Sequence, residues 1–168
     1  MAGRVGFTAD LHLGHEWAAE IRGFRSVKDH NETIIHNIAT DFPSTRDVVW
    51  ILGDIAFGKE YIKLLSEIPA IKKLVLGNHD HYHISFFQAV ADQVYGAYQH
   101  KTGVLLTHIP VELTQKNRFT LNAHGHTHER VLSDPWYFNC CLDQNNMRPF
   151  KVEQLYERMK AIGRWEYG

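Results

Sequence analysis

Short clusters of Asp, Asn and His side chains follow apolar runs at five places along the chain. All five clusters lie within the first 128 of the 168 residues. Apolar runs of strand length that alternate with helical patterns are typical of an α/β fold built on a parallel sheet. Ligands bind such sheets beyond the carboxyl ends of the strands. We therefore expect the five clusters to meet at one rim of the fold.

Expected strands and helices alternate along the sequence. Ser26, followed three residues later by Asp29, is a helix start, and apolar residues then recur every four positions as far as Phe42. We see no linker, repeat or low-complexity segment, and we predict one domain over residues 1–168. We expect strands at 4–9, 47–52, 74–76, 104–107 and 119–122, another starting at 136, and further helices at 62–68, 86–94 and 155–162.

Composition narrows the class of protein. The formal net charge of −1 gives no general attraction to nucleic acid or to an anionic membrane. No run approaches the roughly 18 apolar residues of a membrane helix, and the N-terminus lacks the apolar core of a signal peptide. The two neighbouring cysteines, Cys140 and Cys141, fit a reducing compartment. We expect a soluble, cytoplasmic protein with no membrane partner, and the oligomeric state stays open.

Two of the clusters have metal-chelating spacing. Asp10 and His12 are two residues apart, so their side chains point to the same side of an extended backbone. His126 and His128 repeat this spacing with two imidazoles. The Asp10 and His12 pair alone is a weak signal, because a capping Asp beside a surface His would give the same pattern, whereas the pair of imidazoles at 126 and 128 is a stronger one.

The other clusters supply oxygens and a proton carrier. Asp54 follows Gly53, and its two carboxylate oxygens could bridge two metal ions, although a lone Gly-Asp usually makes a turn. The amide oxygen of Asn78 is a neutral ligand, unless this residue forms an Asx turn. His79 could act as acid or base, with Asp80 orienting its imidazole.

The order of these clusters resembles the calcineurin-like metallophosphoesterase superfamily. The runs 8–15 and 52–58 look most like the small stand-alone phosphoesterases of bacteria and their phages. After Asp54, residues 55–58 lack the arginine of phosphoprotein phosphatases, which disfavours that activity. The matching motifs are Asp10-Leu-His12, Gly53-Asp54, Gly77-Asn-His-Asp80, Thr107-His108 and Gly125-His-Thr-His128.

The resemblance implies a fold and a set of ligands. The fold would be two stacked mixed β-sheets flanked by helices, a four-layer metallophosphoesterase sandwich, with a dimetal site at the carboxyl ends of the strands. His79 would be the catalytic histidine, helped by Asp80. One ion would be held by Asp10, His12 and His128 and the other by Asn78, His108 and His126, with Asp54 bridging the two ions.

The expected activity is hydrolysis of a phosphoester by a hydroxide that bridges two divalent ions. Mixed Asp, Asn and His ligands suit borderline metals, with Mn²⁺ as the working choice and Fe²⁺, Zn²⁺ or Ni²⁺ as alternatives. His79 would stabilise the transition state or protonate the leaving oxygen. Failure of a His79 substitution to lower turnover would remove this residue from the mechanism.

Substrate choice has less support in the sequence. A domain this small favours a phosphodiesterase acting on compact diesters such as cyclic nucleotides, with the 2′,3′-cyclic form preferred. A phosphomonoesterase, a Mn²⁺-dependent nuclease, or a catalytically silent scaffold with the same fold are the alternatives, and nucleic acid is not the favoured partner. His15, Phe57 and Tyr82 could line the substrate pocket, although packing or exposure would explain each of them equally well.

Overall fold

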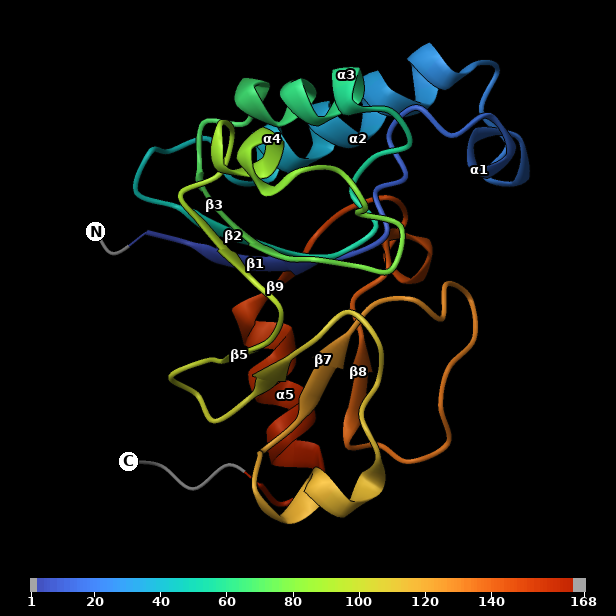
Figure 1. Ribbon diagram of the computed structural model, residues 1–168. Helices are drawn as coiled ribbons and strands as arrows, with labels where there is room; N and C mark the ends of the chain where they lie inside the picture. The colour runs from blue at the N-terminus through green and yellow to red at the C-terminus, as the bar shows by residue number, and fades with distance from the viewer. Residues whose placement is uncertain (1–2, 165–168) are drawn as a thin grey trace.

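Two mixed β-sheets form the centre of the protein, and helices flank them, as Figure 1 shows for the computed structural model. The structure describes residues 3–164. In the first sheet β1 to β4 are parallel neighbours, while β9 is antiparallel to β1. The order is β4-β3-β2-β1-β9, with β1 (Val5–Thr8), β2 (Val48–Leu52), β3 (Ile71–Val75), β4 (Gln93–Tyr95) and β9 (Phe150–Lys151).

The second sheet has the order β5-β6-β7-β8. β6, β7 and β8 run parallel, and β5 pairs antiparallel with β6. An isolated parallel bridge between Ala9 and Cys141 connects the end of β1 with the segment after β8. The strands are β5 (Tyr98–Gln99), β6 (Leu105–Leu106), β7 (Asn122–His124) and β8 (Tyr137–Asn139).

Helices cover the first sheet on its outer face. In Figure 1, α2 (Val27–Asp41), α3 (Lys59–Ile62) and α4 (Ile84–Gln88) lie together on that face, while α5 (Val152–Ala161) lies on the other side of the sheet. α1 (Glu16–Ile21) lies apart, beyond the end of β1. None of the helices formed by residues 3–164 is long and apolar enough to cross a membrane. Three short 3-10 helices span Lys63–Glu67, Leu113–Asn117 and Leu142–Gln144.

Strand β2 separates two hydrophobic cores. Val49 and Ile51 face the core beneath the helices, whereas Trp50 and Leu52 face the core between the two sheets. Successive side chains of a strand point to opposite faces, so a strand that is buried on both faces must be apolar throughout. This explains the uninterrupted apolar sequence of β2.

The start of α2 follows the sequence signature. The Oγ atom of Ser26 accepts a hydrogen bond from the backbone N–H of Asp29 at 3.1 Å. This contact satisfies one of the backbone donors left free at a helix N-terminus. At the other end of the helix, Phe42 is fully buried.

Some elements differ from those expected. The helix expected over 86–94 ends at Gln88, and Val94 lies in β4. Phe87, Val90 and Val94 all face the core beneath the helices, so their spacing could not distinguish one helix from a helix followed by a strand. The expected helix over 62–68 is the last residue of α3 followed by a 3-10 helix, and the strand expected over 119–122 starts only at 122. The sequence did not indicate α1, β4, β5 or β9.

Candidate metal centre

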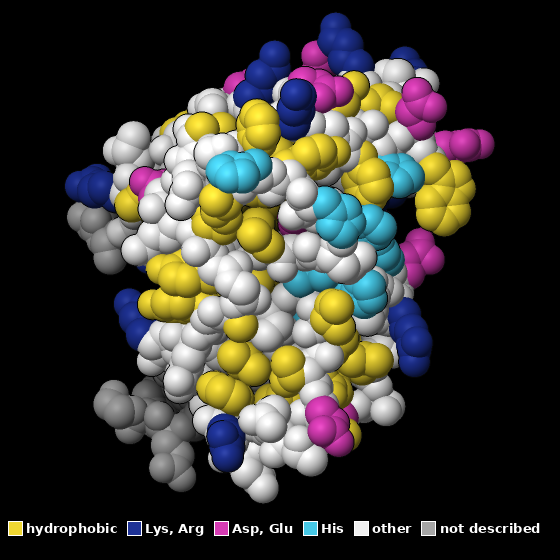
Figure 2. All heavy atoms as spheres, viewed as in Figure 1, with side chains coloured by type: hydrophobic (Ala, Val, Ile, Leu, Met, Phe, Trp, Pro, Cys, Tyr) yellow, Lys and Arg dark blue, Asp and Glu magenta, His cyan; other side chains and the backbone are white. Residues whose placement is uncertain are grey.

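The polar clusters converge at one edge of the molecule, because they follow parallel strands from both sheets. Asp10, Asp54, His108 and His126 each come two residues after the end of β1, β2, β6 and β7, and Asn78 comes three residues after β3. Figure 2 shows histidine side chains gathered on one face of the protein, with hydrophobic side chains around them. The convergence expected from the sequence is therefore present in the fold.

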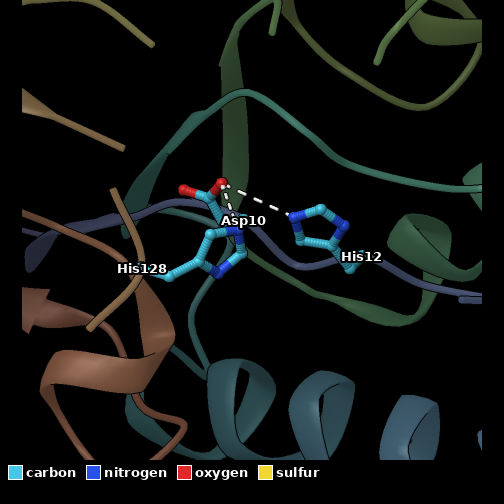
Figure 3. A group of neighbouring side chains, drawn as sticks. All are labelled: Asp10, His12 and His128. Atoms are coloured by element: carbon cyan, nitrogen blue, oxygen red, sulfur yellow. Dashed lines mark ion pairs between the residues drawn. The ribbon is translucent and has the colours of Figure 1, made fainter. Parts of the chain in front are cut away.

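One group consists of Asp10, His12 and His128, whose potential ligand atoms all lie within 4.8 Å of one another. Asp10 Oδ1 lies 3.5 Å from His12 Nε2 and 3.6 Å from His128 Nε2. In Figure 3 both imidazole rings are turned toward the same carboxylate. These are the three residues expected to hold the first ion.

A second group consists of Asp54, His108 and His126, again with ligand atoms within 4.8 Å of one another. The amide oxygen of Asn78 lies 2.9 Å from His108 Nε2, which places it beside this group. Asp54 Oδ1 faces His108 Nε2 at 3.4 Å, while Asp54 Oδ2 faces His12 Nε2 at 3.8 Å. The two oxygens of Asp54 therefore face different groups.

Buried polar atoms of the first group have no hydrogen-bond partner among the residues that the structure describes. They are Asp10 Oδ1 and both ring nitrogens of His12. Unpaired buried polar atoms are costly and rare in folded proteins. A cation placed between Asp10 Oδ1 and His12 Nε2 would satisfy an atom of each residue, and Asp and His are ligands for borderline divalent metals. The residues present therefore fit a divalent metal ion.

Left-handed backbone is concentrated at the candidate ligands. The φ angles of Asp10, His12, Asp54, His126 and His128 are 57°, 50°, 50°, 69° and 47°. Left-handed backbone is uncommon outside glycine, and strained residues cluster at functional sites. Of the seven described non-glycine residues with a positive φ, five are candidate ligands, and the other two are Asn146 and Met147.

Glycines make room for the carboxylates. Gly53 has a φ of 85°, and a Cβ atom there would lie 2.5 Å from His108 Nδ1. A Cβ on Gly125 would lie 2.5 Å from Asp10 Oδ2, and one on Gly77 would overlap Asp54 Oδ1. The motif glycines are therefore required by close approach of ligand side chains to the backbone.

The acidic and basic groups of the centre shift the pKa values of one another. Burial acts to raise the pKa of Asp54, but the His108 side chain and the backbone N–H of His79 outweigh it and lower this pKa to about 2. Burial acts to lower the pKa of His108, yet Asp54 and Asp10 raise it overall. Burial likewise opposes the ionised form of Asp10, but His12 and His108 hold its pKa below the usual value. The site thus stabilises carboxylates in their charged, metal-binding form.

Two positioning residues were missed by the sequence analysis. The Nδ1 atom of His128 lies 3.2 Å from Asp143 Oδ2, and this contact raises the pKa of His128. Arg22 donates to both carboxylate oxygens of Asp143 at 2.9 and 2.8 Å and to the backbone oxygen of Asp10 at 2.8 Å. Neither residue belongs to a spaced motif, so only the fold reveals their proximity to the ligands.

The position of Asp80 corrects its expected role. Its carboxylate oxygens accept hydrogen bonds from the backbone N–H groups of Ile55 at 2.9 Å and Gly77 at 2.8 Å. Within residues 3–164, no hydrogen bond joins Asp80 to the ring of His79. Asp80 therefore ties the loop after β2 to the loop after β3, and it acts on the backbone that carries His79. The His79 side chain is 46% exposed, and its Nε2 lies 3.9 Å from Asp54 Oδ2.

A cleft of about 520 Å³ opens beside the first group of ligands. His15 and Phe57, two of the three expected pocket residues, line it. The Phe57 ring stacks on His12 with 5.2 Å between ring centroids and meets His15 edge-on at 4.0 Å. Tyr82 does not line this cleft; it packs against the core beneath the helices.

Comparisons with known proteins identify phage relatives and a shared fold. The chain is 34% identical to the Gene 66 protein of Mycobacterium phage D29, in an alignment covering 76% of this chain and 80% of the phage protein. The Gene 66 protein of Mycobacterium phage L5 is 29% identical, with 75% and 78% covered. The crystal structure of a protein of unknown function from Aquifex aeolicus superposes with a TM-score of 0.75 at 21% identity, covering 92% of this chain and 98% of that protein. A scan against protein-family models finds no match.

Proposed function

We propose that this chain, which belongs to the family of the mycobacteriophage Gene 66 proteins, is a metal-dependent phosphoesterase with a calcineurin-like four-layer sandwich fold. The position of Asp54 carries the proposal. One of its oxygens faces His108 at 3.4 Å, and the other faces His12 at 3.8 Å and His79 at 3.9 Å. A carboxylate shared by two ligand groups can bind two neighbouring cations, one through each oxygen.

The proposed ligand sets combine all seven predicted residues. Two divalent ions bound there would neutralise charge on phosphoryl oxygens and lower the pKa of water. The Asp, Asn and His side chains favour Mn²⁺, with Fe²⁺, Zn²⁺ and Ni²⁺ as alternatives. The first ion would be held by Asp10, His12 and His128, the second by Asn78, His108 and His126, and Asp54 would bridge them.

His79 is the proposed catalytic acid. Hydrolysis forms one bond from a water oxygen to phosphorus and breaks the ester P–O bond, so the leaving oxygen needs a proton. The His79 ring is half exposed at the edge of the centre, and its backbone N–H donates to Asp54 Oδ1 at 3.0 Å, which fixes the loop beside the ligands. Proton donation by a positioned side chain is typically worth about 10²–10⁴-fold in rate.

A small phosphodiester is the proposed substrate. The cleft of about 520 Å³ lies within the range of small-molecule sites, about 300–1,000 Å³. The cleft is lined by His12, His79 and His128, which also belong to the proposed centre. A phosphate bound at the centre would therefore place the rest of the ester in this cleft. Cyclic nucleotides match this size, and the 2′,3′-cyclic form is the proposed first choice.

A metal-supplemented substrate panel tests the proposal. The panel contains 2′,3′- and 3′,5′-cyclic nucleotides, bis(4-nitrophenyl) phosphate, 4-nitrophenyl phosphate and plasmid DNA, each with Mn²⁺, Fe²⁺, Zn²⁺ or Ni²⁺. We expect the diesters to be cleaved fastest. Faster cleavage of the monoester would identify a phosphomonoesterase, and faster cleavage of DNA would identify a nuclease.

Three variants assign the chemistry to the centre. His79→Gln should retain bound metal and lose about 10²–10⁴-fold in turnover, whereas Asp54→Asn should lose metal as well. His81→Gln changes an exposed neighbouring histidine and serves as the control. A wild-type protein that neither binds metal nor cleaves any ester would contradict the proposal and favour the scaffold alternative.

A further inference from the structure

One wall of the cleft is formed by α1, which exposes two large apolar side chains. Trp17 and Ile21 are 66% and 58% exposed, and both line the cleft together with Ala18. Residues four apart lie on the same face of a helix. Apolar side chains of this size that line a cleft beside a polar centre indicate a binding surface.

Hydrogen bonds fix this wall relative to the metal ligands. At the start of α1, His15 Nδ1 accepts from the backbone N–H of Ala18 at 3.2 Å. At its end, Arg22 donates to the backbone oxygens of Asp10 at 2.8 Å and Leu11 at 3.3 Å and pairs with Asp143. The distance between Trp17 and the first ligand group is therefore set by the fold.

Polar side chains lie on another side of the same cleft. Thr127, Glu129 and Arg130 follow β7 and line it, and Glu129 and Arg130 are exposed. Neither charged group forms an ion pair with another residue in the described part of the chain. A ligand in this cleft would thus meet an apolar aromatic surface and both a hydrogen-bond donor and acceptors.

We infer that this cleft binds the nucleobase of a nucleotide ester, with the base against Trp17 and Ile21 and its polar edge toward Glu129 and Arg130. A nucleobase has apolar faces and an edge that carries donors and acceptors, which matches the two kinds of wall. An alkyl chain could form no hydrogen bond with Glu129 or Arg130, whereas the edge of a base carries both donors and acceptors. The inference rests on the proposed function, because that function places the phosphate at the metal centre.

Binding of AMP and ribose 5-phosphate tests this inference, because ribose 5-phosphate keeps the phosphate and the sugar but carries a hydroxyl group in place of the base. Calorimetry with Mn²⁺-supplemented protein measures both dissociation constants, and tryptophan fluorescence gives a second readout. We expect AMP to bind tighter and to quench the fluorescence. Stacking on an aromatic side chain is strong enough that Trp17→Ala should raise the dissociation constant of AMP about tenfold, while that of ribose 5-phosphate stays unchanged.

Matched variants sharpen the result. Trp17→Phe should largely restore AMP binding, because it restores an aromatic face. Leu113→Ala removes an exposed apolar side chain outside the cleft and should change neither ligand. Equal binding of AMP and ribose 5-phosphate, unaffected by Trp17→Ala, would overturn the inference. The inference would also be overturned if the two ligands bound equally and the protein self-associated in a way that Trp17→Ala abolished. In that case Trp17 and Ile21 would form a contact with a second copy of the chain.

Hydrolysis rates separate this inference from the proposed function. The two substrates are a nucleoside 2′,3′-cyclic phosphate and the 2′,3′-cyclic phosphate of methyl riboside, which lacks the base. Metal-dependent cleavage of both with equal kcat/KM, in wild type and in Trp17→Ala, would overturn the inference alone. Tight, Trp17-dependent AMP binding without any metal-dependent cleavage would support the base site and contradict the proposed function.

Discussion

Asp143 determines how His128 presents its ring to the candidate centre. It contacts His128 Nδ1 at 3.2 Å, which leaves Nε2 facing Asp10, and Arg22 neutralises its charge. Partners of this kind set the orientation and basicity of a metal-binding histidine. An exchange of the carboxylate for an amide should therefore affect metal binding without touching a ligand.

Asp143→Asn should weaken metal binding about 10- to 100-fold. A competition titration of Mn²⁺ against a chelating dye measures the affinity, and circular dichroism checks that the variant is folded. Asp134→Asn is the control, because Asp134 pairs with Lys116 at 2.7 Å and lies in neither ligand group. An affinity equal to that of wild type would show that Asp143 has only a structural role.

His100 should make folding stability depend on pH. Burial, followed by the charges of Lys101 and Lys73, lowers the pKa of His100 to about 4 in the folded protein, against about 6.5 in an unfolded chain. The unfolded state therefore binds more protons between these two values, and stability falls as the pH falls through this window. From pH 7.5 to pH 5 the expected loss is about 2 kcal/mol.

Urea unfolding at both pH values measures this loss. His100→Gln cannot titrate, so its free energy of unfolding should fall by about 2 kcal/mol less than that of wild type over the same interval. The difference between the two proteins removes contributions from other groups, including buried His30, whose pKa burial also lowers to about 4. Parallel profiles for the two proteins would show that His100 is free to take up a proton in the folded state.

At the scale of elements, the cap of α2 makes a measurable contribution. Ser26→Ala removes the acceptor for the backbone N–H of Asp29 and should cost about 1 kcal/mol of folding free energy. Chemical denaturation followed by circular dichroism measures the change. Ser66→Ala, in an exposed position of the 3-10 helix Lys63–Glu67, is the matched control and should be near neutral. Equal stabilities of the two variants would mean that solvent replaces the cap.

The strands that position the centre were predictable, because their apolar runs end at polar clusters. β1, β2 and β3 end within one residue of the expected positions, although β3 starts three residues earlier than expected. Short elements paired at the edges, such as β5 and β9, have two residues each and no sequence period to reveal them. Phe119 and Leu121 have the alternating pattern of a strand, because both pack in the core between the sheets. The backbone at these residues nevertheless forms no strand.

The candidate ligands of the centre were visible in the sequence, but their supporting contacts were not. Spacing brought Asp10 and His12 together, whereas Asp143 reaches His128 only through the path of the chain after β8. The left-handed backbone at Asp10 and Asp54 was not predicted either, because Asp adopts this conformation more often than most residues but only in a small fraction of cases. Motifs therefore identify which side chains can bind a metal, and the fold identifies what orients them.

For the whole molecule, metal binding should add to stability. Asp10 and Asp54 follow strands of the first sheet, and His108 and His126 follow strands of the second, so bound ions would connect the two sheets. A ligand that binds only the folded state adds about 2.7 kcal/mol at a concentration of 100 Kd. Addition of Mn²⁺ should raise the Tm, and EDTA should reverse the shift.

Thermal unfolding with and without Mn²⁺ measures this effect. Asp10→Asn removes the charge of a ligand and should reduce the metal-dependent shift in Tm. Exposed Asp29, outside both ligand groups, provides Asp29→Asn as a charge-matched control that should keep the full shift. An unchanged Tm at saturating Mn²⁺ in the wild-type protein would contradict the presence of a folded-state metal site.

Insertions and deletions within strand β2 should be poorly tolerated in this family. Trp50 belongs to one core and Ile51 to the other, and Asp54 follows two residues beyond the strand. An insertion or deletion of one residue within 48–52 would move side chains from one core to the other. It would also turn the carboxylate of Asp54 away from His12 and His108. Single-residue insertions and deletions should therefore be tolerated less well along this strand than in the exposed surface loops of the protein.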